Sequence, residues 1–127
     1  MADTLFDAEH LREPPPIPAP AVPRGERQRA RFRGAIAVGM HPLSLTVSPY
    51  LRLHPDAQRE IGGTGPRCGG CRFRVSVGGH ARSFPKCMWP EPDLRRRVNR
   101  DRFTHGPATD CRASWPACTD YQPAVTG

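Results

Sequence analysis

The clearest alternation of apolar and polar positions lies at residues 72–77 (RFRVSV), where every second side chain is apolar. This spacing is typical of a β-strand. A glycine-containing loop at residues 78–80 follows, so we predict a hairpin centred on Gly79. In that register Cys71 directly faces Cys87, and directly opposed residues have Cβ atoms about 4.5–5.5 Å apart. The hairpin therefore predicts that these two thiols lie side by side.

Elsewhere prolines interrupt the apolar positions, and the pattern divides the chain into four parts. Every cysteine and both tryptophans fall within one stretch, which we predict to be the ordered domain. The stretch before it has short apolar runs broken by proline, which favours extended and loop structure. The first part is rich in proline and arginine, a composition typical of an unstructured arm. The predicted parts are an arm (1–34), an extended or loop segment (35–63), a cysteine domain (64–122) and a tail (123–127).

Composition limits what such a chain can build. Its 127 residues are 37% hydrophobic and include 16 prolines and 12 glycines, so we expect no large apolar core. No apolar run approaches the roughly 18 residues that a membrane span needs. The N-terminus has acidic residues and no apolar stretch, unlike a signal peptide, which predicts a cytoplasmic location. Disulfides are disfavoured in that compartment, so the five cysteines indicate metal or redox chemistry.

The cysteines have the spacing of a metal site. Cys68 and Cys71 form a C-x2-C pair whose two glycines permit a tight turn, and the hairpin adds Cys87. A tetrahedral zinc site needs one more ligand, for which Cys118 and Cys111 compete. We favour a structural zinc site with four cysteine ligands. An iron–sulfur cluster, a metal-free thiol redox pair and inert buried cysteines remain alternatives.

The positive charge is concentrated in two arginine-rich segments. The chain has 19 basic and 12 acidic residues, a net charge of +7, and every basic residue except Lys86 is arginine. Such runs are either solvated or in contact with phosphate. The candidate nucleic-acid-binding residues are Arg29, Arg31, Arg33, Arg95, Arg96, Arg97, Arg100 and Arg102.

No catalytic constellation is recognisable. The chain lacks a nucleophile elbow and an H-E-x-x-H motif, and residues 104–110 (THGPATD) are interpreted as a loop that returns the chain to the metal site. His41 and His54 each precede a proline and are interpreted as loop residues, and His80 and His105 are weaker candidate ligands. We therefore predict a protein without enzymatic activity or a small-molecule substrate.

The cysteine domain resembles small uncharacterised proteins of actinobacteria and their phages. The similarity covers roughly residues 41–122 and is strongest in RCGGCRFRV, HARSFPKC, THGPATD and WPAC. It implies a cysteine-coordinated metal and carries no activity. In that pattern an aliphatic residue stands in place of Cys111 and an aromatic residue in place of Ser114. The ligands that the resemblance implies are Cys68, Cys71, Cys87 and Cys118, with Cys111 as a spare thiol or an alternative ligand.

Together these features predict a small metal-stapled domain like a zinc ribbon, with a β-hairpin, mostly irregular structure and a disordered N-terminal arm. The predicted function is that of a small structural-zinc binding or adaptor protein. Its expected partners are nucleic acid or a host protein complex, contacted through the arginine clusters. The alternative is an iron–sulfur redox or sensor protein.

Overall fold

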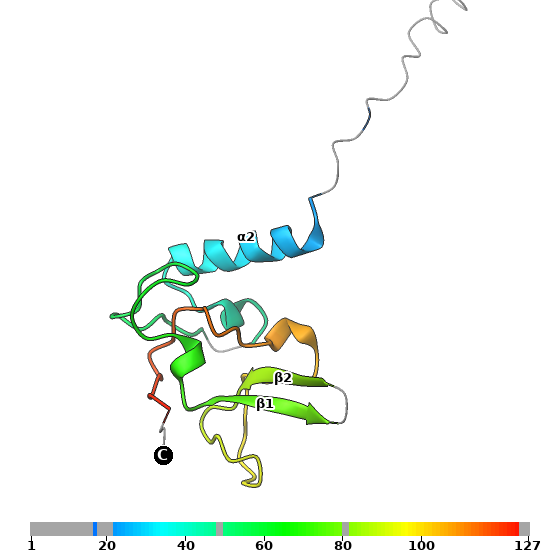
Figure 1. Ribbon diagram of the computed structural model, residues 1–127, viewed down its shortest axis with the longest axis vertical. Helices are drawn as coiled ribbons and strands as arrows, with labels where there is room; N and C mark the ends of the chain where they lie inside the picture. The colour runs from blue at the N-terminus through cyan, green and yellow to red at the C-terminus, as the bar shows by residue number, and fades with distance from the viewer. Residues whose placement is uncertain (1–16, 18–21, 48–49, 80–81, 125–127) are drawn as a thin grey trace, which may run out of the picture.

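The computed structural model describes residues 17, 22–47, 50–79 and 82–124 (Figure 1). Within these residues it has one α-helix and one two-stranded antiparallel sheet, and most of the chain is irregular, which confirms the prediction of a small hairpin fold. No helix among the described residues is long and apolar enough to cross a membrane. The elements are α2 (Arg24–Ala37), β1 (Arg74–Gly79), β2 (Arg82–Cys87) and the 3-10 helices η1 (Pro42–Leu45), η2 (Cys68–Gly70) and η3 (Pro107–Thr109).

Helix α2 overturns the prediction of an unstructured arm through residue 34. Residues 24–34 are helical, whereas residues 1–16 and 18–21 of the predicted arm lie outside the described part of the chain. Phe32, Ala35 and Ile36 are buried, and their spacing of three and four residues places them on one face of the helix. The arginines that suggested disorder occupy the other faces, where they remain in solvent.

The helix ends in a glycine motif that turns the chain toward the core. Gly39 has a positive φ of 82°, and its amide donates a hydrogen bond to the carbonyl oxygen of Ile36. The amide of Met40 donates to the carbonyl oxygen of Ala35. These two bonds define a Schellman motif, which needs a residue that tolerates the left-handed conformation. The turn brings His41 directly into the interior, where it is buried.

The hairpin forms where the sequence predicts it, but in a different register. Cys87 pairs with Arg74, not with Cys71, and Val77 pairs with Phe84. An odd change of register brings the opposite set of β2 side chains onto the face of Phe73. The amide of Met88 donates to the carbonyl oxygen of Phe73, and both side chains are buried. The observed register thus groups apolar side chains on one face, which a hairpin centred on Gly79 does not.

The predicted segment 35–63 is mostly irregular, but its first residues belong to α2. Within it, Leu43 is buried as part of the 3-10 helix η1.

The C-terminal segment joins the separate parts of the molecule. It runs between α2 and the hairpin, coloured orange to red in Figure 1. Isolated β-bridges connect it to four earlier parts of the chain, because Asp110 pairs with Lys86, Pro116 with Arg67, Cys118 with Leu53 and Pro123 with Cys71. The last two cysteines are therefore held against the segments that carry the first three.

A small core surrounds Trp115, which is 1% exposed. The Phe32 ring from α2 packs edge-on against Trp115 at a centroid distance of 4.9 Å, and the His41 ring packs against it at 5.5 Å. Cys68 and Cys111 belong to the same cluster of buried residues, with Leu43 and Leu51. The hydrophobic core and the cysteines thus form one continuous interior.

The loop at residues 104–110 is tied to β2 by the only lysine of the chain. Lys86 is buried, and its Nζ lies 2.7 Å from Oδ1 of Asp110. It also donates to the carbonyl oxygen of Gly106 and to Oγ1 of Thr109. As predicted, this loop leads the chain back to the cysteines, since the amide of Cys111 donates to the carbonyl oxygen of Pro85.

Candidate metal centre

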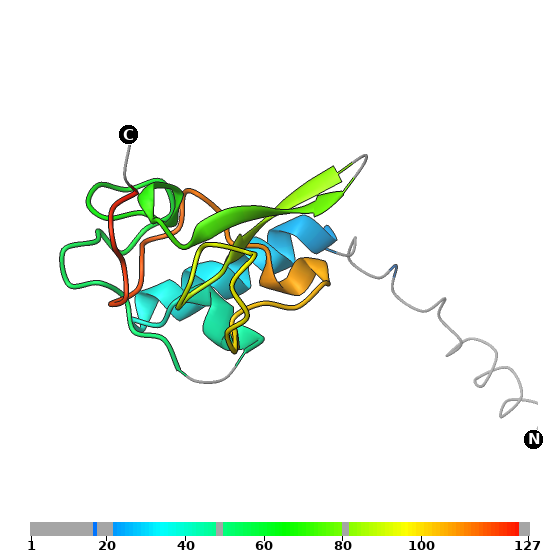
Figure 2. The ribbon, with the colours of Figure 1, turned by 90° about the horizontal axis from the view of Figure 1, so that it is seen from below.

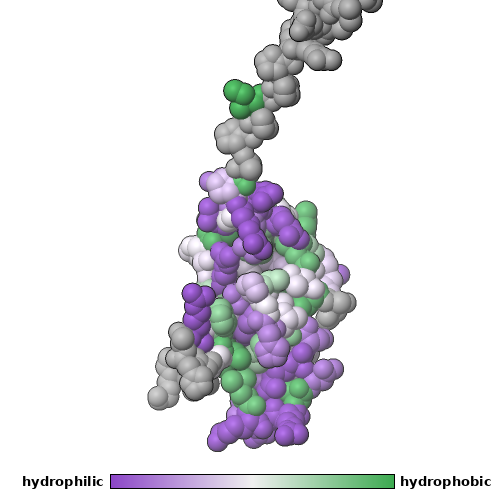
Figure 3. All heavy atoms as spheres, turned by 90° about the vertical axis from the view of Figure 1, so that its right-hand side faces the viewer, coloured by the Kyte–Doolittle hydropathy of each residue, from purple (hydrophilic) through white to green (hydrophobic). Residues whose placement is uncertain are grey.

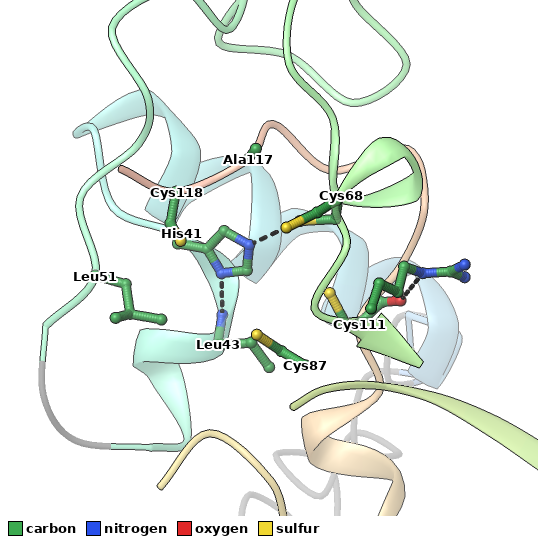
Figure 4. Close-up of a pocket in the computed structure, with 10 residues that line it drawn as sticks. His41, Leu43, Leu51, Cys68, Cys87, Cys111, Ala117 and Cys118 are labelled. Atoms are coloured by element: carbon green, nitrogen blue, oxygen red, sulfur yellow. Dashed lines mark hydrogen bonds between the residues drawn. The ribbon is translucent and has the colours of Figure 1, made fainter. Parts of the chain in front are cut away.

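All five cysteines line one small cavity of about 20 Å³ in the interior (Figure 4). The cavity lies between the end of η2, the end of β2 and the C-terminal segment, and His41 closes one side of it. Figure 4 shows these side chains reaching the shared space from different parts of the chain. The residues that line it are His41, Leu43, Leu51, Cys68, Cys71, Arg74, Cys87, Cys111, Ala117 and Cys118.

The structure brings the predicted ligands together, but the strand pairing that positions Cys87 differs from the predicted pairing. Cys68 lies in η2, and the amide of Cys71 donates to the carbonyl oxygen of Cys68, which is the tight turn expected of the C-x2-C pair. Cys87 reaches the cavity as the last residue of β2, not by facing Cys71 across the sheet. Cys111 lines the same cavity and is 2% exposed, so it is no peripheral thiol.

His41 is the member of this site that the sequence interpretation missed. It was interpreted as a loop residue, but it is 2% exposed and its Nε2 lies 3.1 Å from Sγ of Cys68. Its Nδ1 accepts a hydrogen bond from the amide of Leu43, so the proton of the neutral ring belongs on Nε2. Burial, together with the nearby positive charge of Arg102, lowers the pKa of His41 to about 3. The neutral imidazole therefore donates its Nε2–H to the Cys68 sulfur.

The other two histidines that the structure describes, His54 and His105, do not line the cavity. His54 resembles His41 in preceding a proline, but its Nδ1 accepts a hydrogen bond from the amide of Asp56. His105 is exposed and packs its ring against Phe103. His80 lies outside the described residues.

The interior position favours the protonated form of three of the thiols, because it raises the pKa of Cys68, Cys87 and Cys118. The hydrogen bond between the side chains of Cys68 and Cys111 raises the pKa of Cys68, and burial raises it further. Burial raises the pKa of Cys87 to about 12 and also raises that of Cys118. Reactive cysteines have a lowered pKa and partial exposure, so these buried thiols do not have the character of nucleophiles.

Arg102 supplies a buried positive charge beside the sulfurs. It is 3% exposed, and its guanidinium lies 3.7 Å from Sγ of Cys118 and 2.6 Å from Oδ2 of Asp120. The group also stacks over the ring of Trp89 at 4.1 Å. This placement corrects its assignment as a candidate nucleic-acid contact, since a buried, ion-paired arginine does not reach a partner's phosphates.

The other candidate arginines divide into structural and exposed side chains. Arg100 is also corrected, because its guanidinium donates to the carbonyl oxygens of Met88, Glu91 and Asp93 and holds that loop together. Arg95 is exposed but pairs with Asp93 at 3.1 Å. The remaining candidates are exposed on α2 or on the loop after Asp93: Arg29, Arg31, Arg33, Arg96 and Arg97.

The cysteines are gathered but are not arranged as a finished coordination shell. Within the described residues, no three histidine, cysteine, aspartate or glutamate side chains have the geometry of a metal site. The donor set, however, is one of soft sulfurs around a single small space, which is the chemistry that zinc prefers in structural sites.

The fold and the site define a small basic chain whose cysteines share one interior cavity with a buried histidine. In comparisons with known proteins, no family model, no curated protein and no solved structure matches the chain. The similarity to actinobacterial and phage proteins therefore stays a prediction, and the function must be argued from the site itself.

Proposed function

We propose that this chain binds one Zn²⁺ through four cysteine thiolates and uses it as a structural centre. The observation that supports the proposal is the shared cavity, where cysteines from four separate parts of the chain meet. The proposed ligands are Cys68, Cys71, Cys87 and Cys118. Four thiolates complete a tetrahedral shell and leave no position for water or substrate, so the centre stabilises the fold and the protein acts as a small binding or adaptor module.

The size of the cavity favours a single ion over a cluster. A volume of about 20 Å³ is close to that of one water-sized probe. A four-iron cluster contains eight iron and sulfide atoms and needs a larger space. Iron–sulfur chemistry uses the same four thiolates and is the alternative outcome of metal analysis.

Two outer groups fit a thiolate-bound zinc. Zinc with four thiolates carries a net charge of −2, which the buried guanidinium of Arg102 partly balances at Cys118. The Nε2–H of His41 donates to the Cys68 sulfur and fixes its direction. If His41 were itself a ligand through Nε2, Nδ1 would carry the proton and could not accept from the amide of Leu43. His41 therefore orients a ligand.

The fifth thiol sets the sharpest test of the ligand assignment. Cys111 lines the same cavity as Cys68, so it is the alternative to Cys118 as the fourth ligand. We expect Cys71→Ser and Cys87→Ser to lose the metal and the folded state, while Cys111→Ser keeps both. Loss of metal in Cys111→Ser combined with its retention in Cys118→Ser would show that the ligand assignment is wrong.

Metal analysis of the purified chain, prepared without added metal or chelator, tests the proposal directly. One zinc per chain with no visible absorption is the expected result. Iron together with sulfide and a broad visible absorption band would show that the centre is an iron–sulfur cluster and not zinc. A folded chain without any metal would refute the proposal.

A further inference from the structure

Helix α2 presents an arginine-lined groove that the cysteine centre does not use. Arg24, Arg27 and Arg31 line it together with Gln28, and Ala108 of η3 forms the opposite side. The groove has a volume of about 370 Å³. The three arginines lie at positions i, i+3 and i+7 of the helix, so they follow one another along the same face. The concave shape distinguishes this surface from a row of solvated side chains on a convex helix.

The packing of α2 fixes the direction in which these arginines point. Only its second half is anchored, by Phe32, Ala35 and Ile36, and the described residues before Phe32 are exposed or half-buried. The first two turns therefore bury no side chain and leave Arg24, Arg27 and Arg31 exposed. Figure 3 shows a largely hydrophilic surface at the end of the molecule where the helix begins. The end of β1 and the start of β2 lie toward the same end of the molecule as the start of α2 (Figures 1 and 2).

A neighbouring side chain braces the groove without neutralising it. The Arg112 guanidinium lies over the Phe32 ring at 5.1 Å and donates to Oε1 of Gln28 at 3.2 Å. In the part of the chain that the structure describes, Arg24, Arg27 and Arg31 form no ion pair. Within the described residues, the groove therefore keeps the positive charge of its three arginines.

The lining favours the backbone of a nucleic-acid duplex over other anions. Arg24, Arg27 and Arg31 place three positive charges along about 10 Å of the helix, and a duplex carries one negative charge per about 1.7 Å of its axis, so this row faces several phosphates of a duplex at once. Arginine binds phosphate through two parallel hydrogen bonds. No aromatic side chain lines the groove, whereas proteins that bind single strands stack bases on aromatic rings.

Among duplexes, the exposed first turns of α2 favour DNA over RNA. The major groove of B-form DNA is about 12 Å wide and admits an α-helix. The major groove of A-form RNA is too narrow for side chains to read. We propose that the groove of α2 binds the phosphate backbone of double-stranded DNA. This proposal deepens the proposed function, because it names the partner of the binding module and the surface that contacts it.

Fluorescence anisotropy with a labelled 20-base-pair DNA duplex tests this proposal on the full chain. Three phosphate contacts predict that affinity falls about 40-fold between 50 and 200 mM salt. The double substitution Arg27→Gln with Arg31→Gln removes two contacts and should leave a fall of only about 3- to 4-fold. Glutamine is nearly as good a helix former as arginine, so α2 should keep its structure, which circular dichroism checks.

The matched control removes two positive charges from a surface outside the groove. Arg52→Gln with Arg59→Gln changes two exposed arginines that line neither the groove nor the cysteine cavity, and we expect it to keep the 40-fold salt dependence of the unchanged protein. An equal loss of salt dependence in both double variants would overturn the proposal, because net charge alone would then explain binding. Equal or tighter binding of a single strand or an RNA duplex of the same length would overturn it as well, as would no binding at 50 mM salt.

The two proposals can fail separately. Zinc content is measured on the same samples, and Arg27 and Arg31 do not line the cysteine cavity. Binding to DNA by a chain without zinc would refute the metal centre and support the groove. A protein that contains zinc but does not bind DNA would support the metal centre and refute the groove as a DNA-binding surface.

Discussion

At the scale of single residues, His41 shows how a buried side chain can organise a sulfur site. The ring is held from three sides, by the Leu43 amide at Nδ1, the Cys68 sulfur at Nε2 and the face of Trp115. A hydrogen bond from an N–H group directs a thiolate lone pair and stabilises its charge. Histidine is thereby both a core residue and an outer partner of the proposed centre.

Replacing His41 should weaken zinc binding without removing a ligand. We expect His41→Leu to lower zinc affinity by about 10- to 100-fold, the usual effect of losing an outer-shell partner. Competition with a chromophoric chelator measures this change on folded protein. His54→Leu is the matched control, because His54 also precedes a proline but does not line the cavity, and its affinity should stay unchanged. An equal effect of both substitutions would rule out the role assigned to His41.

Nothing in the sequence distinguishes these two histidines. Each stands in a His-Pro pair, and each accepts a backbone amide hydrogen bond two residues on. What separates them is the turn at Gly39, which carries His41 into the interior, and the approach of Cys68 from 27 residues away. Local pattern predicts the hydrogen-bonded turn, but only tertiary packing decides which histidine meets a sulfur.

At the scale of elements, the sequence predicts what depends on local spacing. A strand and the tight turn of the C-x2-C pair follow from alternation and glycine, although the strand is Arg74–Gly79 and not the predicted 72–77. The hairpin register does not, because it depends on which apolar side chains share a face with Phe73. Helix α2 has a faint signal in Phe32, Ala35 and Ile36 at helical spacing. Five arginines in the same stretch point to a solvated arm instead, so its order comes from packing on Trp115.

The tight turn at the first cysteine pair gives an element-scale prediction. A Cβ on Gly69 would lie 2.8 Å from Cβ of Ala113 and 3.1 Å from its carbonyl oxygen, which the Gly69 amide also contacts by a hydrogen bond. We expect Gly69→Ala to destabilise the fold by about 1–3 kcal/mol, as overpacking does. Urea unfolding measures the difference.

The neighbouring glycine is its control. A Cβ on Gly70 would meet only the hydroxyl oxygen of Tyr121 at 3.6 Å, an ordinary contact. Gly70→Ala should therefore be neutral or slightly stabilising, since alanine restricts the unfolded chain. Similar unfolding midpoints for Gly69→Ala and Gly70→Ala would contradict the close approach of η2 to Ala113.

At the scale of the whole molecule, helix, core and cysteines form one chain of contacts. Phe32 of α2 touches Trp115, Trp115 touches His41, and His41 donates to Cys68. The C-terminal segment adds bridges to both cysteine-bearing regions, so no part of this interior is held independently. A structural zinc contributes on the order of 10 kcal/mol, which is comparable to the total stability of about 5–15 kcal/mol typical of a small domain.

Zinc removal should therefore unfold the distant helix as well as the cysteine site. We expect a chelator to abolish the helical circular dichroism signal at 222 nm in one transition with the tryptophan fluorescence change. Added Zn²⁺ should restore both signals, while Mg²⁺, which prefers oxygen ligands, should restore neither. If the helical signal survived complete zinc removal, the contacts through Phe32 and Trp115 would suffice to hold α2, and the metal would stabilise only its own surroundings.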